Sequence, residues 1–287
     1  MKELKGAQVV AALNADLIKR VEGLKSKGIK PTLAIIRIGD RSDDVAYEKG
    51  ATKRCETIGV SVKKLVMDKN TSQESLIRTI HEVNQDEEIH GVLLFRPLPD
   101  HMDEEMVCNA LKPEKDVDGI TAGSMAGVFM NSDLGFAPCT AQACMELLDY
   151  YDIDLTGKKV AVLGRSLVVG KPVAMMLMQK NATVTICHSK TKDLREQCRE
   201  SDVIIAAMGR AKMIDEGYLA KGQIVLDVGI NMDENGKMCG DVNFSDAISI
   251  VDAVTPVPGG IGTVTTSVLV KHVVEAAEHS ARISNPF

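Results

Sequence analysis

The chain has 287 residues, 45% of them hydrophobic and 26% charged, and its formal net charge at pH 7 is −6. This composition is enough for one large or two ordinary folded domains, and it excludes the strongly basic surface that nucleic-acid binding requires. No stretch approaches the roughly 18 consecutive apolar residues of a membrane span, and charges throughout the first thirty residues argue against a signal peptide. We therefore expect a cytoplasmic protein with no nucleic-acid or membrane partner.

The cysteines and aromatic residues disfavour further classes of protein. The seven cysteines are odd in number, scattered and never in C-x-x-C spacing. This pattern favours reduced thiols over a disulfide framework or structural zinc, so we expect no metal. The chain has no Trp and only 3% aromatic residues, which disfavours a base-stacking surface.

In the first half of the chain, apolar runs alternate with helical patterns. The first thirty residues predict an amphipathic helix, and the Gly/Met/Asn-rich stretch 119–137 suggests an interdomain connection. Between them the spacing predicts strands over 31–39, 61–67 and 89–95, and helices over 42–58 and 72–85. Strands that alternate with helices favour parallel pairing.

The second half continues the alternation with sharper signals. A helix is predicted over about 141–151, and a strand at 158–164 leads through a glycine-containing turn into a helix at 173–180. Further strands are predicted over 183–189, 202–209, 223–229 and 248–254. This is the pattern of a doubly wound nucleotide-binding unit, and a long final helix at 265–282 is expected to return to the first domain.

The turn G-R-S-L-V-V-G-K-P, between a strand and a helix, is typical of phosphate binding. Gly164 permits a tight turn, Gly170 allows close backbone approach, and the helix N-terminus supplies free N–H donors. The spacing is not G-x-G-x-x-G, so a plain strand-to-helix turn stays an alternative.

The end of the next strand indicates which cofactor would bind. NAD sites usually place an acidic residue there, but here the sequence is C-H-S-K-T, with Ser189 and Lys190. A hydroxyl, a lysine and Arg165 from the first turn suit a 2′-phosphate, which favours NADP over NAD. His188 reads as a packed or solvated residue. D-V-G-I-N (227–231) lies at the C-terminal end of a later strand, where doubly wound sheets bind ligand, and the loop V-T-P-V-P-G-G-I-G-T-V-T (254–265) either shapes a pocket between domains or only terminates a strand.

Six motifs in order carry a resemblance that covers the whole chain. They are P-E-K-D-V-D-G (113–119), A-P-C-T (137–140), G-R-S-x-x-V-G-x-P (164–172), C-H-S-K-T (187–191), D-V-G-I-N (227–231) and T-P-V-P-G-G-I-G (255–262). With them the chain resembles the bifunctional methylenetetrahydrofolate dehydrogenase/methenyltetrahydrofolate cyclohydrolase family. The resemblance implies an α/β fold with an N-terminal folate-binding domain (1–138, joined by the C-terminal helix 266–287) and a doubly wound parallel Rossmann domain that binds NADP (139–265). It also implies a cleft between the two domains and a homodimer.

The resemblance also implies site residues. Tyr47 corresponds to the residue that stacks on the folate, and Asp118 to the carboxylate that binds the pterin. The loop Pro258, Gly259 and Gly260 is expected at the substrate. The implied cofactor-binding residues are Thr140, Gly164, Arg165, Ser166, Gly170, Ser189, Ile230 and Thr265.

These two roles make chemical sense. One carboxylate can accept adjacent N–H groups of a pterin, and a tyrosine ring offers a stacking face with a polar tip. Taken without the resemblance, Asp118 could be a turn residue and Tyr47 a half-buried helix residue.

Two positions that the resemblance links to the cyclohydrolase reaction differ from the family in this chain. The family has a lysine four residues after the tyrosine and a glutamine two residues before Pro-Leu-Pro, where this chain has Ala51 and Phe95. On a helix, Lys49 and Lys53 each point about 160° away from position 51, and on a strand Arg96 would face opposite to Phe95. Asp44 and Thr263 stand where the family commonly has Ser and Pro.

The expected activity is therefore NADP-dependent oxidation of 5,10-methylenetetrahydrofolate to 5,10-methenyltetrahydrofolate, without cyclohydrolase activity. Hydride transfer leaves a stabilised cation and needs no side chain to remove a proton, whereas hydrolysis needs a base. A separate cyclohydrolase would open the product. The alternatives are a bifunctional enzyme with a relocated base, a catalytically inactive folate or nucleotide sensor, and another nicotinamide dehydrogenase on a similar scaffold.

Overall fold

The computed structural model describes residues 2–284, and its contacts divide the chain into two units. The six-stranded unit comprises the residues up to Ala11 together with Thr140–Thr265, and the three-stranded unit comprises Ala12–Cys139 and the chain from Thr266 onward. The first eleven residues differ from the division expected from the sequence. They join the six-stranded unit because β1 (Lys2–Glu3) pairs with β11 (Ala253–Val254).

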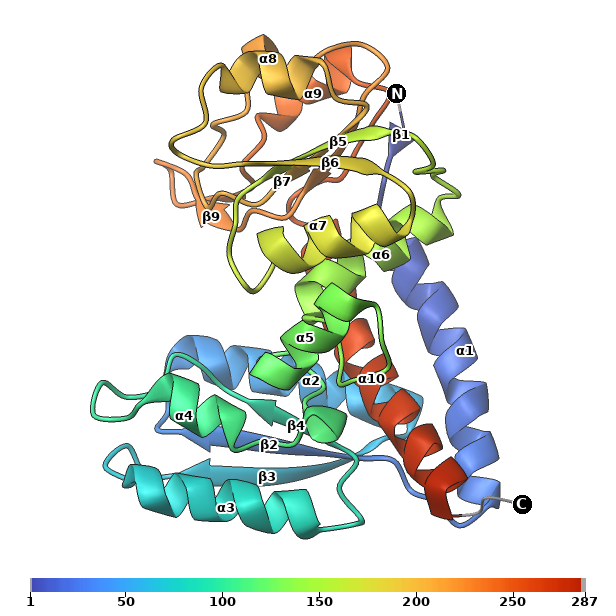
Figure 1. The fold of residues 1–287 in the computed structure, drawn as a ribbon, viewed down its shortest axis with the longest axis vertical. Coiled ribbons are helices and arrows are strands. Elements are labelled where there is room, and N and C mark those ends of the chain that lie inside the picture. Colours follow the sequence, from blue (N-terminus) through green and yellow to red (C-terminus); the bar gives the residue numbers. More distant parts are fainter. Residues whose placement is uncertain (1, 285–287) are drawn as a thin grey trace. The chain divides into compact units, whose positions relative to one another are not determined.

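The three-stranded unit is built on a parallel sheet of order β3-β2-β4. Its strands β2 (Thr32–Ile38), β3 (Ser61–Met67) and β4 (Gly91–Leu94) lie where the sequence predicts them. The crossover helices are α2 (Ser42–Ile58) and α3 (Gln73–Gln85), which cover opposite faces of the sheet (Figure 1). The apolar side of α3 buries Leu76 and Ile80 in one core with residues of β2 and β4.

The remainder of this unit holds shorter elements. These are α4 (Glu104–Asn109), the 3₁₀ helix η1 (Pro113–Lys115) and α5 (Ala122–Met130). The sequence predicts an interdomain connection over 119–137, but the structure forms α5 there. The hydroxyl of Thr121 accepts a hydrogen bond from the Ser124 N–H at 3.1 Å, which caps the helix.

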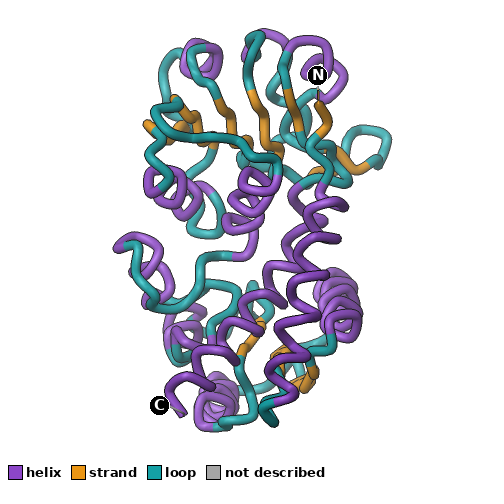
Figure 2. The backbone as a smooth tube through the Cα atoms, turned by 90° about the vertical axis from the view of Figure 1, so that its right-hand side faces the viewer, coloured by secondary structure: helices purple, strands orange, loops and turns teal. Residues whose placement is uncertain are grey.

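Two long helices, α1 (Gly6–Ser26) and α10 (Ile261–Ser284), each contain a boundary between the units. Within the three-stranded unit they run side by side, as Figure 2 shows. The Arg20 guanidinium of α1 donates two hydrogen bonds to the Glu278 carboxylate of α10, at 2.9 and 2.7 Å. This bidentate pair fixes the alignment of the two helices.

The six-stranded unit carries a parallel sheet of order β1-β11-β8-β7-β5-β6. The remaining strands of this sheet are β5 (Lys159–Leu163), β6 (Thr183–Cys187), β7 (Val203–Ala206) and β8 (Ile224–Asp227). The helices are α6 (Cys139–Tyr150), α7 (Gly170–Gln179), α8 (Leu194–Arg199), α9 (Phe244–Ile250) and the 3₁₀ helix η2 (Glu216–Tyr218). A small antiparallel pair, β9 (Asn231–Met232) and β10 (Met238–Cys239), follows β8.

Helices cover both faces of this sheet, α6 and α7 on one and α8 and α9 on the other (Figure 1). One segment differs from the sequence prediction. The predicted strand over 248–254 is a strand only at Ala253–Val254, because its apolar residues begin as the last turn of α9. That helix buries Ala247 in the core beneath it.

The strand order places a ligand site at one edge of the six-stranded sheet. The chain passes from β5 to β6 on one side and then returns to β7 on the other side of β5. Doubly wound sheets bind ligands at such a reversal, at the carboxyl ends of the strands. In the described part of the chain, no helix is long and apolar enough to cross a membrane.

Candidate active site

The turn that follows β5 has no room for side chains at two of its positions. Gly164 has φ +127°, and a Cβ there would strike the carbonyl oxygen of Ala207. A Cβ on Gly170, the first residue of α7, would strike the carbonyl oxygen of Gly164. The hydroxyl of Ser166 accepts hydrogen bonds from the N–H groups of Val169 at 3.1 Å and Gly170 at 3.5 Å, and so holds the turn in shape.

The neighbouring strand brings cationic and hydroxyl groups to the same edge. Because Leu163 pairs with Cys187, the residues after β5 and β6 emerge side by side. Arg165, Ser189 and Lys190 are all exposed there. His188 shapes the second turn, where its Nδ1 accepts from the Lys190 N–H at 3.1 Å. A guanidinium, an ammonium and a hydroxyl fit a phosphate group.

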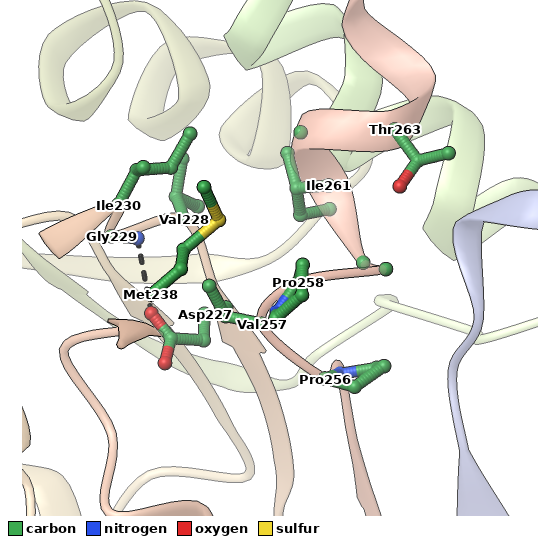
Figure 3. A pocket seen from close by; sticks show the side chains of 13 residues that line it. Asp227, Val228, Gly229, Ile230, Met238, Pro256, Val257, Pro258, Ile261 and Thr263 are labelled. Carbon is green, nitrogen blue, oxygen red and sulfur yellow. Dashed lines mark hydrogen bonds between the residues drawn. The ribbon is translucent and has the colours of Figure 1, made fainter. Parts of the chain in front are cut away.

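A pocket of about 260 Å³ lies at the carboxyl end of β8 (Figure 3). Its walls come from the segment after β8, from β10 and from the loop that leads into α10. They include Ile230, Met238, Pro258, Gly259, Gly260, Ile261 and Thr263. The motifs at 227–231 and 254–265 therefore line one cavity within the six-stranded unit. Thr263 also uses its N–H, which donates to the Gly260 carbonyl at 3.1 Å and which a proline would lack.

Two buried aspartates hold the loops around this pocket. The Asp227 carboxylate accepts from the N–H groups of Gly229, Asp241 and Val242 at 2.9–3.0 Å. Burial nevertheless raises the pKa of Asp227 to about 7. Asp241 is fully buried and accepts from three successive N–H groups, those of residues 208–210. Neither carboxylate has a role that could be predicted from the sequence.

The two threonines implied as cofactor-binding residues lie at helix starts in the same unit. Thr265 is buried in the first turns of α10, and its hydroxyl donates to the Gly262 carbonyl at 3.1 Å. Thr140 is half-buried in the first turn of α6, where its carbonyl accepts from the Cys144 thiol at 3.4 Å.

In the three-stranded unit, Tyr47 lies near Ala51 and Phe95, the two positions that differ from the family that the chain resembles. Tyr47 is half-buried on α2, and Ala51, one turn later, is fully buried. The Phe95 ring, just beyond β4, meets the Tyr47 ring edge-on, with centroids 5.9 Å apart and planes at 84°. Neither Ala51 nor Phe95 presents a side-chain polar atom, so neither can move a proton.

The basic residues near this group point elsewhere. Lys49 and Lys53 are exposed while Ala51 is buried, as the helical spacing predicted. Arg96 was expected to face opposite to Phe95 on a strand. That argument does not apply, because β4 ends at Leu94, before both residues. The Arg96 guanidinium forms an ion pair of 3.4 Å with Glu104.

The structure also accounts for Asp44. Its carboxylate is 7% exposed and receives two hydrogen bonds from the Arg41 guanidinium, at 2.9 and 2.8 Å. The same guanidinium donates to the Arg96 carbonyl at 3.0 Å. The pair therefore ties the start of α2 to the segment that carries Phe95, and the negative charge of Asp44 is neutralised.

Asp116 and Asp118, two positions apart, have different surroundings. The fully buried Asp116 accepts from the Ile120 and Thr121 N–H groups and from the Ser124 hydroxyl. Asp118 is half-buried, and desolvation raises the pKa of its carboxyl to about 6. A hydrogen bond from Cys139 and the positive charge of Arg96 act in the opposite direction. Of the two, Asp118 is the one suited to a ligand.

The sequence-predicted residues thus gather in two groups. Tyr47, Asp118, Ala51 and Phe95 belong to the three-stranded unit, and the predicted cofactor and loop residues belong to the six-stranded unit. Among residues 2–284, no three His, Cys, Asp or Glu side chains lie close enough together to hold a metal ion.

Comparison with known proteins identifies related domains and chains. Residues 4–118 match the family model for the catalytic domain of tetrahydrofolate dehydrogenase/cyclohydrolase, and residues 138–281 match that for its NAD(P)-binding domain. The chain is 51% identical to the bifunctional protein FolD of Carboxydothermus hydrogenoformans, over 96% of this chain and 97% of that protein.

Two solved structures extend the comparison. The bifunctional FolD of Campylobacter jejuni is 38% identical with a TM-score of 0.94, covering 97% of this chain and 99% of that one. The Trypanosoma brucei dehydrogenase-cyclohydrolase, solved with NADP and an inhibitor, is 33% identical with a TM-score of 0.90 and covers 97% of both chains.

Proposed function

This chain belongs to the tetrahydrofolate dehydrogenase/cyclohydrolase family, and on that premise we propose that it is an NADP-dependent methylenetetrahydrofolate dehydrogenase without cyclohydrolase activity. It oxidises 5,10-methylenetetrahydrofolate to 5,10-methenyltetrahydrofolate. The observation that carries the second half is that Ala51 is buried and Phe95 packs on Tyr47, at the two positions where the resemblance implies a lysine and a glutamine. The named relatives are bifunctional, so the proposal sets this chain apart from them.

The residues of the six-stranded unit fit the nucleotide. The Gly164 turn and the start of α7 receive the pyrophosphate, and Arg165, Ser189 and Lys190 receive the 2′-phosphate. Binding of NADP by the Trypanosoma brucei relative supports this choice over NAD. The pocket that Ile230 and Gly262 line, at the other half of the sheet, receives the nicotinamide. The bound nicotinamide supplies the hydride acceptor.

The residues of the three-stranded unit hold the folate. Tyr47 offers its ring as a stacking face, and ionised Asp118 accepts the adjacent N–H groups of the pterin. Loss of hydride leaves a resonance-stabilised cation, so these residues position the substrate and no side chain has to take up a proton. The substituents at 51 and 95 offer no group to activate water.

Hydrolysis of methenyltetrahydrofolate by the purified protein tests the proposal. We expect the wild-type chain to hydrolyse it no faster than buffer does. The double variant Ala51→Lys/Phe95→Gln restores the base and its polar partner, so it should gain cyclohydrolase activity by about tenfold or more over that background.

Lys49→Ala and Lys53→Ala provide the control for a relocated base. Wild-type hydrolysis that either substitution abolishes would establish the bifunctional alternative. Absence of any NADPH formation with methylenetetrahydrofolate would instead favour the inactive sensor.

We also propose that the chain forms a homodimer, with a separate cyclohydrolase acting on its product. The exposed Met232 and Met238 of the β9–β10 pair offer apolar surface for self-association. Sedimentation equilibrium measures the mass in solution, and a monomer at micromolar concentration would contradict this part.

A further inference from the structure

Phe95 leaves the three-stranded sheet at the point where β4 ends. Its N–H donates to the Ile36 carbonyl of β2 at 3.0 Å, one position beyond the last paired residue of β4. Its ring meets the Tyr47 ring of α2 edge-on, with centroids 5.9 Å apart. The contact between the two rings therefore depends on how the segment after β4 is held against α2.

One arginine joins that segment to the start of α2. Arg41 lies at the N-cap position of the helix, but its side chain forms no capping hydrogen bond. The guanidinium instead donates to both carboxylate oxygens of Asp44, at 2.9 and 2.8 Å, and to the Arg96 carbonyl at 3.0 Å. This third hydrogen bond ties the residue after Phe95 to the helix that carries Tyr47.

The carboxylate of Asp44 holds this arginine in one orientation. Asp44 is buried, whereas the Arg41 side chain is 47% exposed. Both oxygens of the buried carboxylate bind the same guanidinium, and this bidentate geometry fixes the direction of the planar group. A lysine offers a single ammonium, so it cannot reproduce this pairing and also reach the Arg96 carbonyl. Asp44 thus orients Arg41, and Arg41 holds the backbone beside Phe95.

We propose that Arg41, oriented by Asp44, is a positioning residue for folate binding, because it holds the segment after β4 so that Phe95 keeps the Tyr47 ring in its stacking orientation. Tyr47 is the third residue after Asp44 on α2, so one turn of helix carries both the anchor of the arginine and the ring that Phe95 meets. This inference rests on the proposed function, in which Tyr47 stacks on the folate. It adds two residues that act through Phe95 and Tyr47 rather than on the substrate.

Steady-state kinetics with methylenetetrahydrofolate and NADP test this role. We expect Arg41→Ala to raise the KM for methylenetetrahydrofolate by about five- to tenfold and to change kcat by less than about twofold, since a binding surface is loosened. The KM for NADP should stay the same, because the proposed cofactor residues lie in the six-stranded unit. Arg41→Lys keeps the charge but not the bidentate geometry, so it should be nearly as impaired as Arg41→Ala. Arg78→Ala, which removes an exposed arginine of α3, is the matched control.

Coupling between Arg41 and Phe95 distinguishes positioning from a general loss of structure. Phe95→Ala removes the ring through which the arginine is proposed to act, so in that background Arg41→Ala should raise the KM further by less than about twofold. Arg41→Ala/Asp44→Ala provides independent evidence should Arg41→Ala fold poorly, since it leaves no buried carboxylate without a partner, and it should show the same rise in KM. Equal effects of Arg41→Ala with and without the Phe95 ring, or an Arg41→Lys variant that behaves as the wild type, would overturn the inference.

Tyr47→Ala separates this inference from the proposed function. If this variant keeps the wild-type KM for methylenetetrahydrofolate, the stacking role of Tyr47 itself is wrong. If it raises that KM while Arg41→Ala and Arg41→Ala/Asp44→Ala keep the wild-type value, only the positioning role fails.

Discussion

Among single residues, Asp118 combines a proposed folate-binding role with an energetic cost. Its half-buried carboxyl has a pKa of about 6, above the unfolded value of about 3.8, so the folded protein resists ionising it. The neighbouring carboxylate of Asp116 is also buried, but two backbone N–H groups and a hydroxyl donate hydrogen bonds to it. A carboxylate kept charged with few protein partners is suited to a ligand.

Asp118→Asn should therefore abolish folate binding and yet stabilise the fold. Above pH 6 the wild type holds a charge at a cost, and the variant should be more stable by about 1–3 kcal/mol. As pH falls through about 6, the folded wild type binds a proton that the unfolded chain does not, so this difference should shrink and vanish below about 4. Urea unfolding of both proteins at several pH values measures it. A variant less stable than the wild type at pH 8 would contradict this account.

Motifs in the sequence marked four positions of interest, Tyr47, Asp118, Ala51 and Phe95. The residues that contact them could not be predicted. The Arg41–Asp44 pair and the bond to the Arg96 carbonyl join segments 55 positions apart. Cys139 and His272 are 133 positions apart, so their proximity could not be predicted from local patterns. For the contact between Cys139 and His272, the signal in the sequence was a single histidine within the apolar run V-L-V-K-H-V-V.

Among elements, the turn between β5 and α7 is the most constrained by its backbone. Its two glycines face carbonyl oxygens of Ala207 and of the turn itself, and Ser166 closes the loop. The apolar patterns of the sequence predicted the strand β5 and the helix α7 to within a few residues, and the glycines marked the turn between them. The error at 248–254 arose because a short apolar run fits a buried helix turn as well as a strand.

Gly164→Ala should weaken NADP binding by about tenfold or more and destabilise the fold by about 2 kcal/mol or more, because its Cβ would displace the backbone at Ala207. Gly157 provides the matched control, since it also has a positive φ, +72°, but a Cβ added there would meet nothing within 4 Å. Gly157→Ala should cost about 1 kcal/mol and leave NADP affinity unchanged. Calorimetric titration with NADP measures both affinities. Equal affinity in the two variants would mean that the turn does not contact the nucleotide.

For the whole molecule, each unit has its own sheet, core and group of candidate residues. Alternating strands and helices made the α/β class and the doubly wound sheet predictable. The sequence could not show that the first eleven residues belong with Thr140–Thr265, because a two-residue strand has no periodicity. The family accounts for the dehydrogenase chemistry, and the proposed loss of cyclohydrolase activity depends on the side chains at positions 51 and 95.

The most direct test follows both products of one reaction on the purified protein. Methylenetetrahydrofolate is supplied with NADP, and in parallel with NAD, at a pH where methenyltetrahydrofolate persists. We predict that methenyltetrahydrofolate accumulates in step with NADPH, that it opens no faster than in buffer, and that NAD supports a slower reaction. Formyltetrahydrofolate appearing as fast as NADPH would contradict the account and mean that a residue other than those at 51 and 95 activates the water.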